Sequence, residues 1–315
     1  MRILLMYSTH EPSPAHRQRL MAMQPEIEVV VARSEQEAVE QSPLAAIIFG
    51  HRYLRQCLPF AENLRWVQST AGGVDRLPCD ELARKGTILT NMTLAADTIA
   101  RHAVTMAWSI NRKIPDFWQQ QIRGVWHQPS EWLPHPRRAI VFGMGSIGLA
   151  VAKILASDGI EVIGVKKTPI APPLPPFTKV CDDDGSWFDE LPHVDWCFLA
   201  LPNTPETQNI FNKRVLSYLP AHAVLVNVGR GETLVTQDLC ELLKQGHLGG
   251  AALDVVFPKP TDSQDLLWGT PRLYITPHVA SHCHERASNI EKFCEQQLLR
   301  FIKNEPLSNL VKFTE

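Results

Sequence analysis

The sequence predicts an α/β protein built from two doubly wound domains. Short apolar, β-branched segments alternate with helix-compatible segments, a pattern typical of parallel sheets with helices on both faces. With 315 residues, the chain exceeds what one hydrophobic core usually organises. We therefore expect residues 1–100 and 282–315 to form a flavodoxin-like first domain, and residues 101–281 to form the second domain.

The first domain is expected to contain five strands. Its β-branched segments occupy residues 2–7, 27–32, 45–49, 64–69 and 88–91. A long amphipathic helix follows at 98–114, where Ile99, Ala103 and Ile110 recur at helical spacing. Residues 281–305 show helical spacing again, and we expect this last helix to return to the first domain.

The second domain is expected to contain six further strands. They occupy residues 139–143, 160–165, 194–200, 223–228, 251–256 and 273–277. The segment 236–246 predicts a helix that begins at Thr236 as N-cap and ends at Gly246. Before the first of these strands, the tryptophan- and proline-rich segment 118–136 predicts an irregular projecting arm, and the five prolines in 169–176 predict a surface loop.

The bulk composition argues against several functions. A formal net charge of -2, from 31 basic and 33 acidic residues, gives no global attraction for nucleic acid or an anionic membrane. No stretch approaches the roughly 20 apolar residues that cross a bilayer. The seven cysteines are scattered and lack metal-type CxxC pairs, which indicates reduced thiols, a cytoplasmic location and no metal centre.

A glycine-rich turn follows the first strand of the second domain. Residues Gly143-Met144-Gly145-Ser146-Ile147-Gly148 form a GxGxxG between that strand and a helical segment. Gly143 permits a tight turn, Gly145 lets a pyrophosphate approach the backbone, and Gly148 allows close helix packing. The alternative is a turn without a ligand. The context favours a Rossmann dinucleotide-binding domain, with phosphates at the helix N-terminus.

The end of the next strand distinguishes the two nicotinamide dinucleotides. An acidic residue there would bind the ribose 2′-hydroxyl and repel a 2′-phosphate. The chain instead has Lys166, Lys167 and Thr168, whose ammonium and hydroxyl groups suit a phosphate. We therefore expect NADP(H) to be favoured over NAD(H). The alternative is a pair of solvated surface lysines.

Six segments along the chain together resemble one enzyme family. They are STAGGVDRL (69–77), GMGSIG (143–148), LPNTPET (201–207), NVGRG (227–231), ALDV (252–255) and TPHVA (276–280). In their order and spacing the chain is similar to the D-isomer-specific 2-hydroxyacid dehydrogenases, especially the glyoxylate/hydroxypyruvate reductase branch. The resemblance implies an NADPH-preferring reductase that transfers a hydride to a small 2-oxo acid, bound in part by the first domain. It also implies a homodimer formed through the arm at 115–136.

The resemblance implies roles for individual residues. Arg230 would be the substrate-binding arginine, whose guanidinium holds a carboxylate and polarises the adjacent ketone. His278 would donate the proton to the reduced carbonyl. The backbone N–H groups of Gly72 and Gly73, with Ala71 beside them, would bind the substrate carboxylate. A plain turn is the alternative for this glycine pair.

Further residues at strand ends are assigned to the cofactor by the same resemblance. They are Leu201, Pro202, Thr207, Val228, Gly229 and Asp254. Asp254 resembles an aspartate that contacts the nicotinamide amide, and a cap at the strand end is the alternative. His282 and His284 lie close together, but their segment has the pattern of a helix start, so no metal is expected there.

Lys259 departs from the family pattern, which has a glutamate that raises the pKa of the histidine at this position. A lysine facing His278 would lower that pKa instead. Three outcomes follow: a shifted pH optimum, a substitute acid such as Asp262 or Glu285, or a weakened catalyst. The last would be a dinucleotide-binding sensor or corepressor-like protein on the same fold. Arg101 also stands where relatives carry an acid, and nothing in the sequence explains it.

Overall fold

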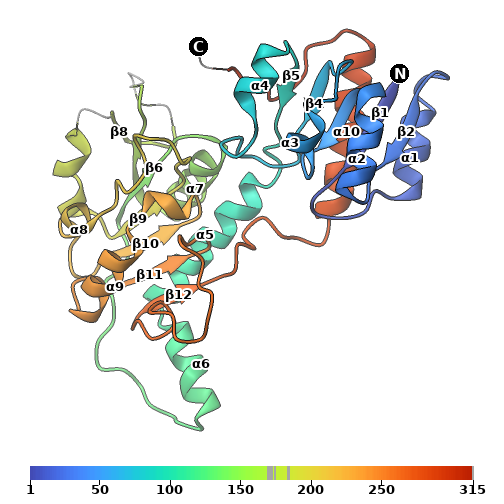
Figure 1. Ribbon diagram of the computed structural model, residues 1–315. Coiled ribbons are helices and arrows are strands. Elements are labelled where there is room, and N and C mark those ends of the chain that lie inside the picture. Colours follow the sequence, from blue (N-terminus) through green and yellow to red (C-terminus); the bar gives the residue numbers. More distant parts are fainter. Residues whose placement is uncertain (169–172, 174, 183–184, 314–315) are drawn as a thin grey trace. The chain divides into compact units, whose positions relative to one another are not determined.

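The computed structural model describes residues 1–168, 173, 175–182 and 185–313 (Figure 1). The chain divides into two compact units: unit 1 comprises Met1–Ala95 and Cys283–Glu315, and unit 2 comprises Ala96–His282. The boundary expected after residue 100 lies inside a helix that belongs wholly to unit 2. Most of the expected proline-rich loop, residues 169–172 and 174, lies outside the described residues.

Unit 1 contains a parallel sheet with the strand order β2-β1-β3-β4-β5. The strands are β1 (Arg2–Met6), β2 (Glu28–Val31), β3 (Ala45–Gly50), β4 (Trp66–Gln68) and β5 (Ile88–Thr90). The helices are α1 (Pro14–Met21), α2 (Glu35–Gln41), η1 (Ser42–Leu44), α3 (Leu54–Cys57), α4 (Cys79–Arg84) and α10 (Arg286–Ile302). All five predicted strands of this unit are present. The chain reverses its direction across the sheet between β1 and β3, where ligands of open α/β sheets usually bind.

Side chains of β1 alternate between two hydrophobic cores. Ile3 and Leu5 pack in one cluster with residues of α1 and α10, whereas Leu4 and Met6 pack in another with residues of α2, α3 and α4. This two-residue period is expected of a strand that is buried on both faces of its sheet. Each such side chain contributes about 1.5–3 kcal/mol through its burial.

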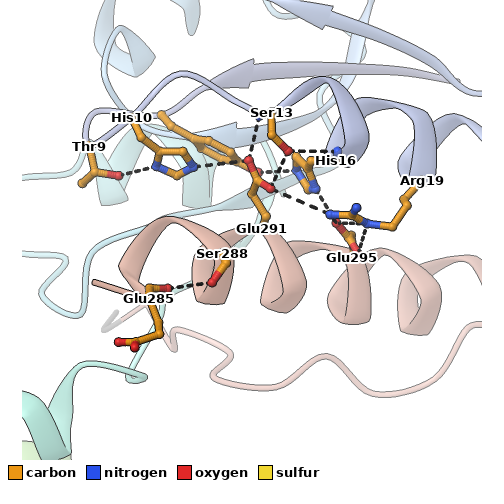
Figure 2. A network of polar contacts seen from close by, with 10 residues as sticks. Thr9, His10, Ser13, His16, Arg19, Glu285, Ser288, Glu291 and Glu295 are labelled. Atoms are coloured by element: carbon orange, nitrogen blue, oxygen red, sulfur yellow. Dashed lines mark hydrogen bonds and ion pairs between the residues drawn. The ribbon is translucent and has the colours of Figure 1, made fainter. Parts of the chain in front are cut away.

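A network of polar side chains joins α1 to α10, as Figure 2 shows. His16 is fully buried, with Nδ1 2.6 Å from Glu295 Oε1 and Nε2 2.9 Å from the Tyr7 hydroxyl. Glu291 accepts hydrogen bonds from the backbone N–H and the hydroxyl of Ser13 at 2.7 and 2.8 Å. Glu291 thereby places a carboxylate at the N-terminus of α1, where the helix dipole favours negative charge. These contacts attach the last helix to the beginning of the chain.

Unit 2 contains a parallel sheet with the strand order β12-β11-β10-β9-β6-β7-β8. The strands are β6 (Arg138–Phe142), β7 (Glu161–Val165), β8 (Lys179–Cys181), β9 (Trp196–Leu199), β10 (Val224–Asn227), β11 (Gly250–Leu253) and β12 (Leu273–Ile275). The six predicted strands of this unit are present. The prediction missed β8, because three residues beginning with a lysine are too few to show a strand pattern.

The helices of unit 2 correct one expectation from the sequence. They are α5 (Ala96–Asn111), α6 (Ile114–Ile122), α7 (Ser146–Ser157), η2 (Ser186–Asp189), η3 (Leu191–His193), α8 (Lys213–Leu216), η4 (Gly231–Thr233) and α9 (Thr236–Lys244). The single helix predicted over 98–114 is wrong at its end, because Lys113 adopts a left-handed φ of 54° that separates α5 from α6. Trp118 therefore lies in a helix, and the irregular arm begins only after Ile122.

The capping prediction for α9 is half correct. The N-cap is Val235 rather than Thr236, whose hydroxyl instead donates to the carbonyl oxygen of Phe257 at 3.1 Å. Gly246 follows the helix with a left-handed φ of 78°, as expected of a glycine after a helix end. All seven cysteines are free thiols. Among the described residues, no helix is both long and apolar enough to cross a membrane.

Candidate functional site

The GxGxxG turn of unit 2 lies where the strand order reverses, between β6 and β9. Gly143 has a φ of 94°, and a Cβ on it would lie 2.6 Å from the carbonyl oxygen of Ala200. A Cβ on Gly148 would lie 1.8 Å from the carbonyl oxygen of Gly143. Both positions therefore require glycine, because backbone atoms occupy the space of a side chain. This crossover point is the usual ligand-binding position of a doubly wound sheet.

Gly145 differs from its two neighbours in the motif. Nothing lies within 4 Å of an added Cβ there, so packing inside the protein does not explain this glycine. Gly145 is also the N-cap of α7, and no side chain caps that helix. Its first-turn N–H groups remain available to an anion, and the helix dipole adds positive potential. The turn therefore fits the pyrophosphate of a dinucleotide.

The candidate 2′-phosphate residues follow β7 on the surface. Lys166, Lys167 and Thr168 are all exposed. Lys167 Nζ lies 3.5 Å from Glu206 Oε1, and both side chains are largely exposed, so this pair contributes little to stability. Within the described part of the chain, the side chains of Lys166 and Thr168 have no hydrogen-bond or ion-pair partner. They remain able to bind a phosphate.

The loop after β9 folds on itself and packs on the next strand end. The Thr207 hydroxyl donates to the carbonyl oxygen of Pro202 at 2.6 Å and accepts the N–H of Thr204 at 2.9 Å. A Cβ on Gly229 would lie 2.6 Å from the carbonyl oxygen of Leu201. The structure thus brings the predicted cofactor residues of two strand ends together, and it uses the Thr207 hydroxyl to shape the loop.

The turn that carries Arg230 is held by a buried amide. Asn227 ends β10, accepts the N–H of Gly229 at 3.0 Å and donates to the carbonyl oxygen of Arg230 at 3.0 Å. The Thr233 hydroxyl donates to the same carbonyl at 2.7 Å. Val228 is buried under this turn, and Arg230 is half-buried with its Nη1 donating to Gly229 at 2.9 Å. The backbone of Arg230 is therefore fixed before any ligand binds.

His278 lies in the loop after β12, next to the end of β11. Its backbone has a left-handed φ of 56°, which a histidine rarely adopts. Its N–H donates to the carbonyl oxygens of Asp254 and Thr276, both at 2.9 Å. The side chain is exposed. An unusual backbone held by several hydrogen bonds is a common feature of functional residues.

Asp254 organises this loop through its carboxylate. The side chain is buried and accepts the Thr276 hydroxyl at 2.6 Å, the Val279 N–H at 2.9 Å and the Ala280 N–H at 3.1 Å. The three donors bracket the histidine position along the chain. These contacts agree with the strand-end cap, the alternative that the sequence left open for Asp254.

His102 of α5 extends this network, and the sequence analysis overlooked it. Its Nε2 lies 3.0 Å from the Thr276 hydroxyl and 3.7 Å from Asp254 Oδ1. A histidine inside a predicted amphipathic helix carries no local signal of such a role, because its partners are remote in sequence. Asn227 stands in the segment NVGRG but was given no role, although a polar residue that ends an apolar strand could have indicated one.

The candidate carboxylate-binding loop belongs to unit 1. Ser69 follows β4 and accepts the N–H of Ala71 at 3.1 Å, while Asn91 Nδ2 donates to the carbonyl oxygen of Gly72 at 2.6 Å. The N–H of Met92 donates to the carbonyl oxygen of Ala71 at 3.1 Å. None of the hydrogen bonds among the described residues uses the N–H of Gly72 or Gly73. Two N–H donors are therefore available in this loop.

The residues that depart from the family pattern are exposed. Lys259 and Arg101 form no ion pair within the described residues. Of the two substitute acids considered, Asp262 caps the N–H of Gln264 at 2.7 Å, and Glu285 lies in unit 1 at the N-cap of α10. Across the described chain, no group of histidine, cysteine or acidic residues has the arrangement of a metal site.

A glycine turn at a sheet crossover, with an uncapped helix behind it, defines unit 2 as a dinucleotide-binding domain. Residues 104–280 match the family model described as D-isomer specific 2-hydroxyacid dehydrogenase, NAD binding domain. The chain therefore belongs to the D-isomer specific 2-hydroxyacid dehydrogenases, which are oxidoreductases that use a nicotinamide dinucleotide. This confirms the family predicted from the six segments.

The similar proteins include a glyoxylate/hydroxypyruvate reductase and solved structures of the family. A glyoxylate/hydroxypyruvate reductase A of Yersinia enterocolitica is 30% identical over 233 residues, which cover 70% of this chain and 71% of that protein. A D-isomer specific 2-hydroxyacid dehydrogenase family protein of Aeromonas salmonicida is 28% identical, with a TM-score of 0.81 and 99% of each chain covered. A D-isomer specific 2-hydroxyacid dehydrogenase of Xanthobacter autotrophicus, solved in complex with NADPH and MES, is 26% identical with a TM-score of 0.79. The match covers 99% of this chain and 98% of that one.

Proposed function

We propose that this protein is an NADPH-preferring reductase of small 2-oxo acids of the glyoxylate and hydroxypyruvate type, yielding the D-2-hydroxy acid. The observation that carries the proposal is the loop of His278, held at the end of β11 by the buried carboxylate of Asp254. Arg230 extends from the adjacent strand end on an equally fixed turn. A cation and a proton donor at neighbouring strand ends suit a carboxylate with an adjacent ketone.

The roles of the residues follow from their chemistry. The Arg230 guanidinium binds the substrate carboxylate and polarises the 2-oxo group. In unit 1, the N–H groups of Gly72 and Gly73 are donors of the kind that bind a carboxylate. When bound, the reduced nicotinamide supplies the hydride. The His278 imidazole donates its proton to the oxygen on carbon 2, which becomes the hydroxyl of the product. Asp254 keeps the histidine loop in place through the reaction.

The preference for NADPH rests on residues after β7. Lys166 and Thr168 present an exposed ammonium and hydroxyl without a side-chain partner in the described part of the chain. The NADPH complex of the Xanthobacter relative supports the same choice. Comparing KM for NADPH and NADH tests it, and a lower KM for NADH would contradict it.

We also propose a homodimer that buries the outer face of α6. Four apolar side chains of this helix and the following arm, Ile114, Trp118, Ile122 and Trp126, are 54% to 96% exposed. Asp116 accepts the Tyr274 hydroxyl at 3.0 Å, which attaches α6 to β12. Contiguous exposed apolar surface of this kind usually marks an interface. A monomeric mass in solution would contradict the dimer.

A second candidate function is a dinucleotide-binding sensor that barely turns over. Lys259 favours it, because the position expected to raise the histidine pKa carries a positive charge instead. Measuring NADPH consumption against glyoxylate, hydroxypyruvate and pyruvate separates the two functions. The reductase predicts saturable turnover with at least one of these acids, whereas dinucleotide binding without turnover would support the sensor.

A further inference from the structure

His102 lies on α5, the helix that packs across β10 and β11, and its imidazole reaches the support of the His278 loop. Its Nε2 lies 3.0 Å from the Thr276 hydroxyl oxygen and 3.7 Å from Asp254 Oδ1. His102, Thr276 and Asp254 all belong to unit 2. The contact therefore joins a helix to the loop that carries the proposed proton donor.

The direction of these hydrogen bonds follows from the acceptors of the Thr276 hydroxyl. This hydroxyl donates to Asp254 Oδ1 at 2.6 Å. Its other acceptor, Met106 Sδ, lies at 3.9 Å and is a weak one, because a thioether sulfur accepts poorly. A hydroxyl has one hydrogen, so Thr276 accepts from His102 rather than donating to it. The ring hydrogen of His102 is therefore on Nε2.

His102 adds a donor from outside the loop to the contacts of the buried carboxylate. Asp254 Oδ1 receives both the Thr276 hydroxyl and the N–H of Val279, the residue that follows His278. Because the Asp254 side chain is buried, its oxygens depend on protein donors instead of water. Successive hydrogen bonds polarise one another, so the bond from His102 makes the Thr276 hydroxyl a stronger donor to this oxygen.

Packing does not explain a histidine at position 102. Its side chain is 26% exposed and lines a pocket of about 280 Å³ between α5, α6 and β12. Much of the remaining wall is apolar and includes Met106, Ile110, Pro115 and Ile275. An apolar side chain would suit these neighbours better than an imidazole, whose polar atoms need partners when they are buried. The bond to Thr276 is therefore the contact that makes use of the imidazole.

We propose that His102 is a positioning residue for proton transfer, because it holds the Thr276 hydroxyl on Asp254 and so keeps the backbone of His278 in place. The inference rests on the proposed reductase function. Without the donor, the hydroxyl is free to turn toward Met106, and the carboxylate then holds the histidine loop less firmly.

The defect should appear in kcat rather than in substrate binding. The turn of Arg230, the residue proposed to bind the substrate carboxylate, is held separately by Asn227. Loss of the His102 donor leaves these contacts intact. The KM for the 2-oxo acid and the Kd for the dinucleotide should therefore stay unchanged.

Two variants of similar size separate the donor from the space that it fills. His102→Leu removes the donor, whereas His102→Gln keeps an N–H group within reach of Thr276. We expect His102→Leu to lower kcat about three- to tenfold, the loss of one hydrogen bond, and His102→Gln to recover most of it. His102→Asn, whose amide is too short to reach Thr276, should match His102→Leu. Ser109→Ala, which alters the wall of the same pocket, should behave as the wild-type protein.

Amide hydrogen exchange gives a second measurement that needs no turnover. The N–H groups of Val279 and Ala280 donate to the Asp254 carboxylate and should exchange faster in His102→Leu than in the wild-type protein or His102→Gln. Thermal unfolding on the same samples verifies that each variant is folded.

Three results would overturn the role of His102. They are an equal fall of kcat in His102→Leu and His102→Gln, a loss in KM instead of kcat, and unchanged exchange of this loop in His102→Leu. Absence of turnover with every 2-oxo acid in the wild-type protein would instead overturn the proposed function. The exchange comparison would still decide whether His102 supports the loop.

Discussion

The backbone N–H of His278 donates to the carbonyl oxygen of Asp254 at 2.9 Å, while the Asp254 carboxylate accepts the N–H groups of the two residues that follow the histidine. One buried aspartate therefore fixes the backbone on both sides of the proposed proton donor. The histidine keeps its left-handed φ because these bonds offset the local strain. Catalysis should depend on this support as well as on the imidazole.

Asp254→Asn tests this support. The amide keeps the shape of the side chain but replaces one acceptor with a donor, facing N–H and O–H groups that need acceptors. We expect the free energy of unfolding to fall by about 1–3 kcal/mol. We also expect kcat to fall about 100-fold, because His278 is misplaced. Denaturant unfolding and steady-state rates measure both effects. Asp158→Asn, at an exposed turn of the same unit, is the matched control, and a similar loss of kcat in that variant would count against the explanation.

Two glycines of the GxGxxG turn serve different purposes, one in dinucleotide binding and the other in folding. Gly145→Ala places a Cβ in open space, so we expect unchanged stability and a dinucleotide Kd raised at least about tenfold, since a methyl group keeps the phosphate from the backbone. Gly148→Ala places a Cβ 1.8 Å from a carbonyl oxygen and should destabilise the fold by about 1–3 kcal/mol or more. Nucleotide titration measures the dinucleotide Kd of both variants, and thermal unfolding measures their stability. If folded Gly145→Ala protein bound the dinucleotide as tightly as the wild-type protein does, the phosphate site would not lie at that turn.

Lys259→Glu tests whether residue 259 acts on the proposed proton donor. We propose that this position faces His278, where a carboxylate would stabilise the protonated imidazole and a lysine would disfavour it. Reduction requires the protonated histidine, so the variant should stay active to higher pH than the wild-type protein. The pH dependence of kcat/KM measures this shift. An unchanged profile would mean that Lys259 does not act on His278.

The His16–Glu295 pair predicts an acid-sensitive contribution to stability. Burial raises the pKa of Glu295, but hydrogen bonds from Arg19 and His16 outweigh this effect and hold the pKa below its ordinary value of 4.5. The ionised carboxylate therefore stabilises the fold above about pH 4.5, and this stabilisation is lost as the pH falls through the folded-state pKa. Glu295→Gln should lower Tm near pH ~7, and the difference from wild type should shrink near pH ~3. Glu62→Gln, at an exposed site, should change little at either pH.

The sequence was sufficient to predict the elements whose signals are local. Apolar β-branched segments predicted every strand except β8, and the glycines of residues 143–148 gave the position of the turn before α7. The break at Lys113 was missed because a left-handed residue outside glycine leaves no compositional trace. Thr236 was assigned as a cap on residue type alone, while the structure uses its hydroxyl for a bond to Phe257.

The supports of the candidate site could not be predicted, because they join residues that are remote in sequence. Spacing along the chain placed Arg230 and His278 at strand ends. It could not show that Thr276 bonds to both His102 and Asp254, or that His51 meets Ser69 across two strands. Such contacts depend on strand order and register, which only the folded sheet defines.

The most direct test of the reductase mechanism is the rate of NADPH-dependent hydroxypyruvate reduction in His278→Asn, with NADPH affinity measured on the same protein. Asparagine tolerates the left-handed backbone but cannot donate the proton as an imidazolium does. The mechanism predicts a fall in kcat of about 10²- to 10⁴-fold with an unchanged NADPH Kd. A variant that reduces the acid as fast as the wild-type protein would contradict it.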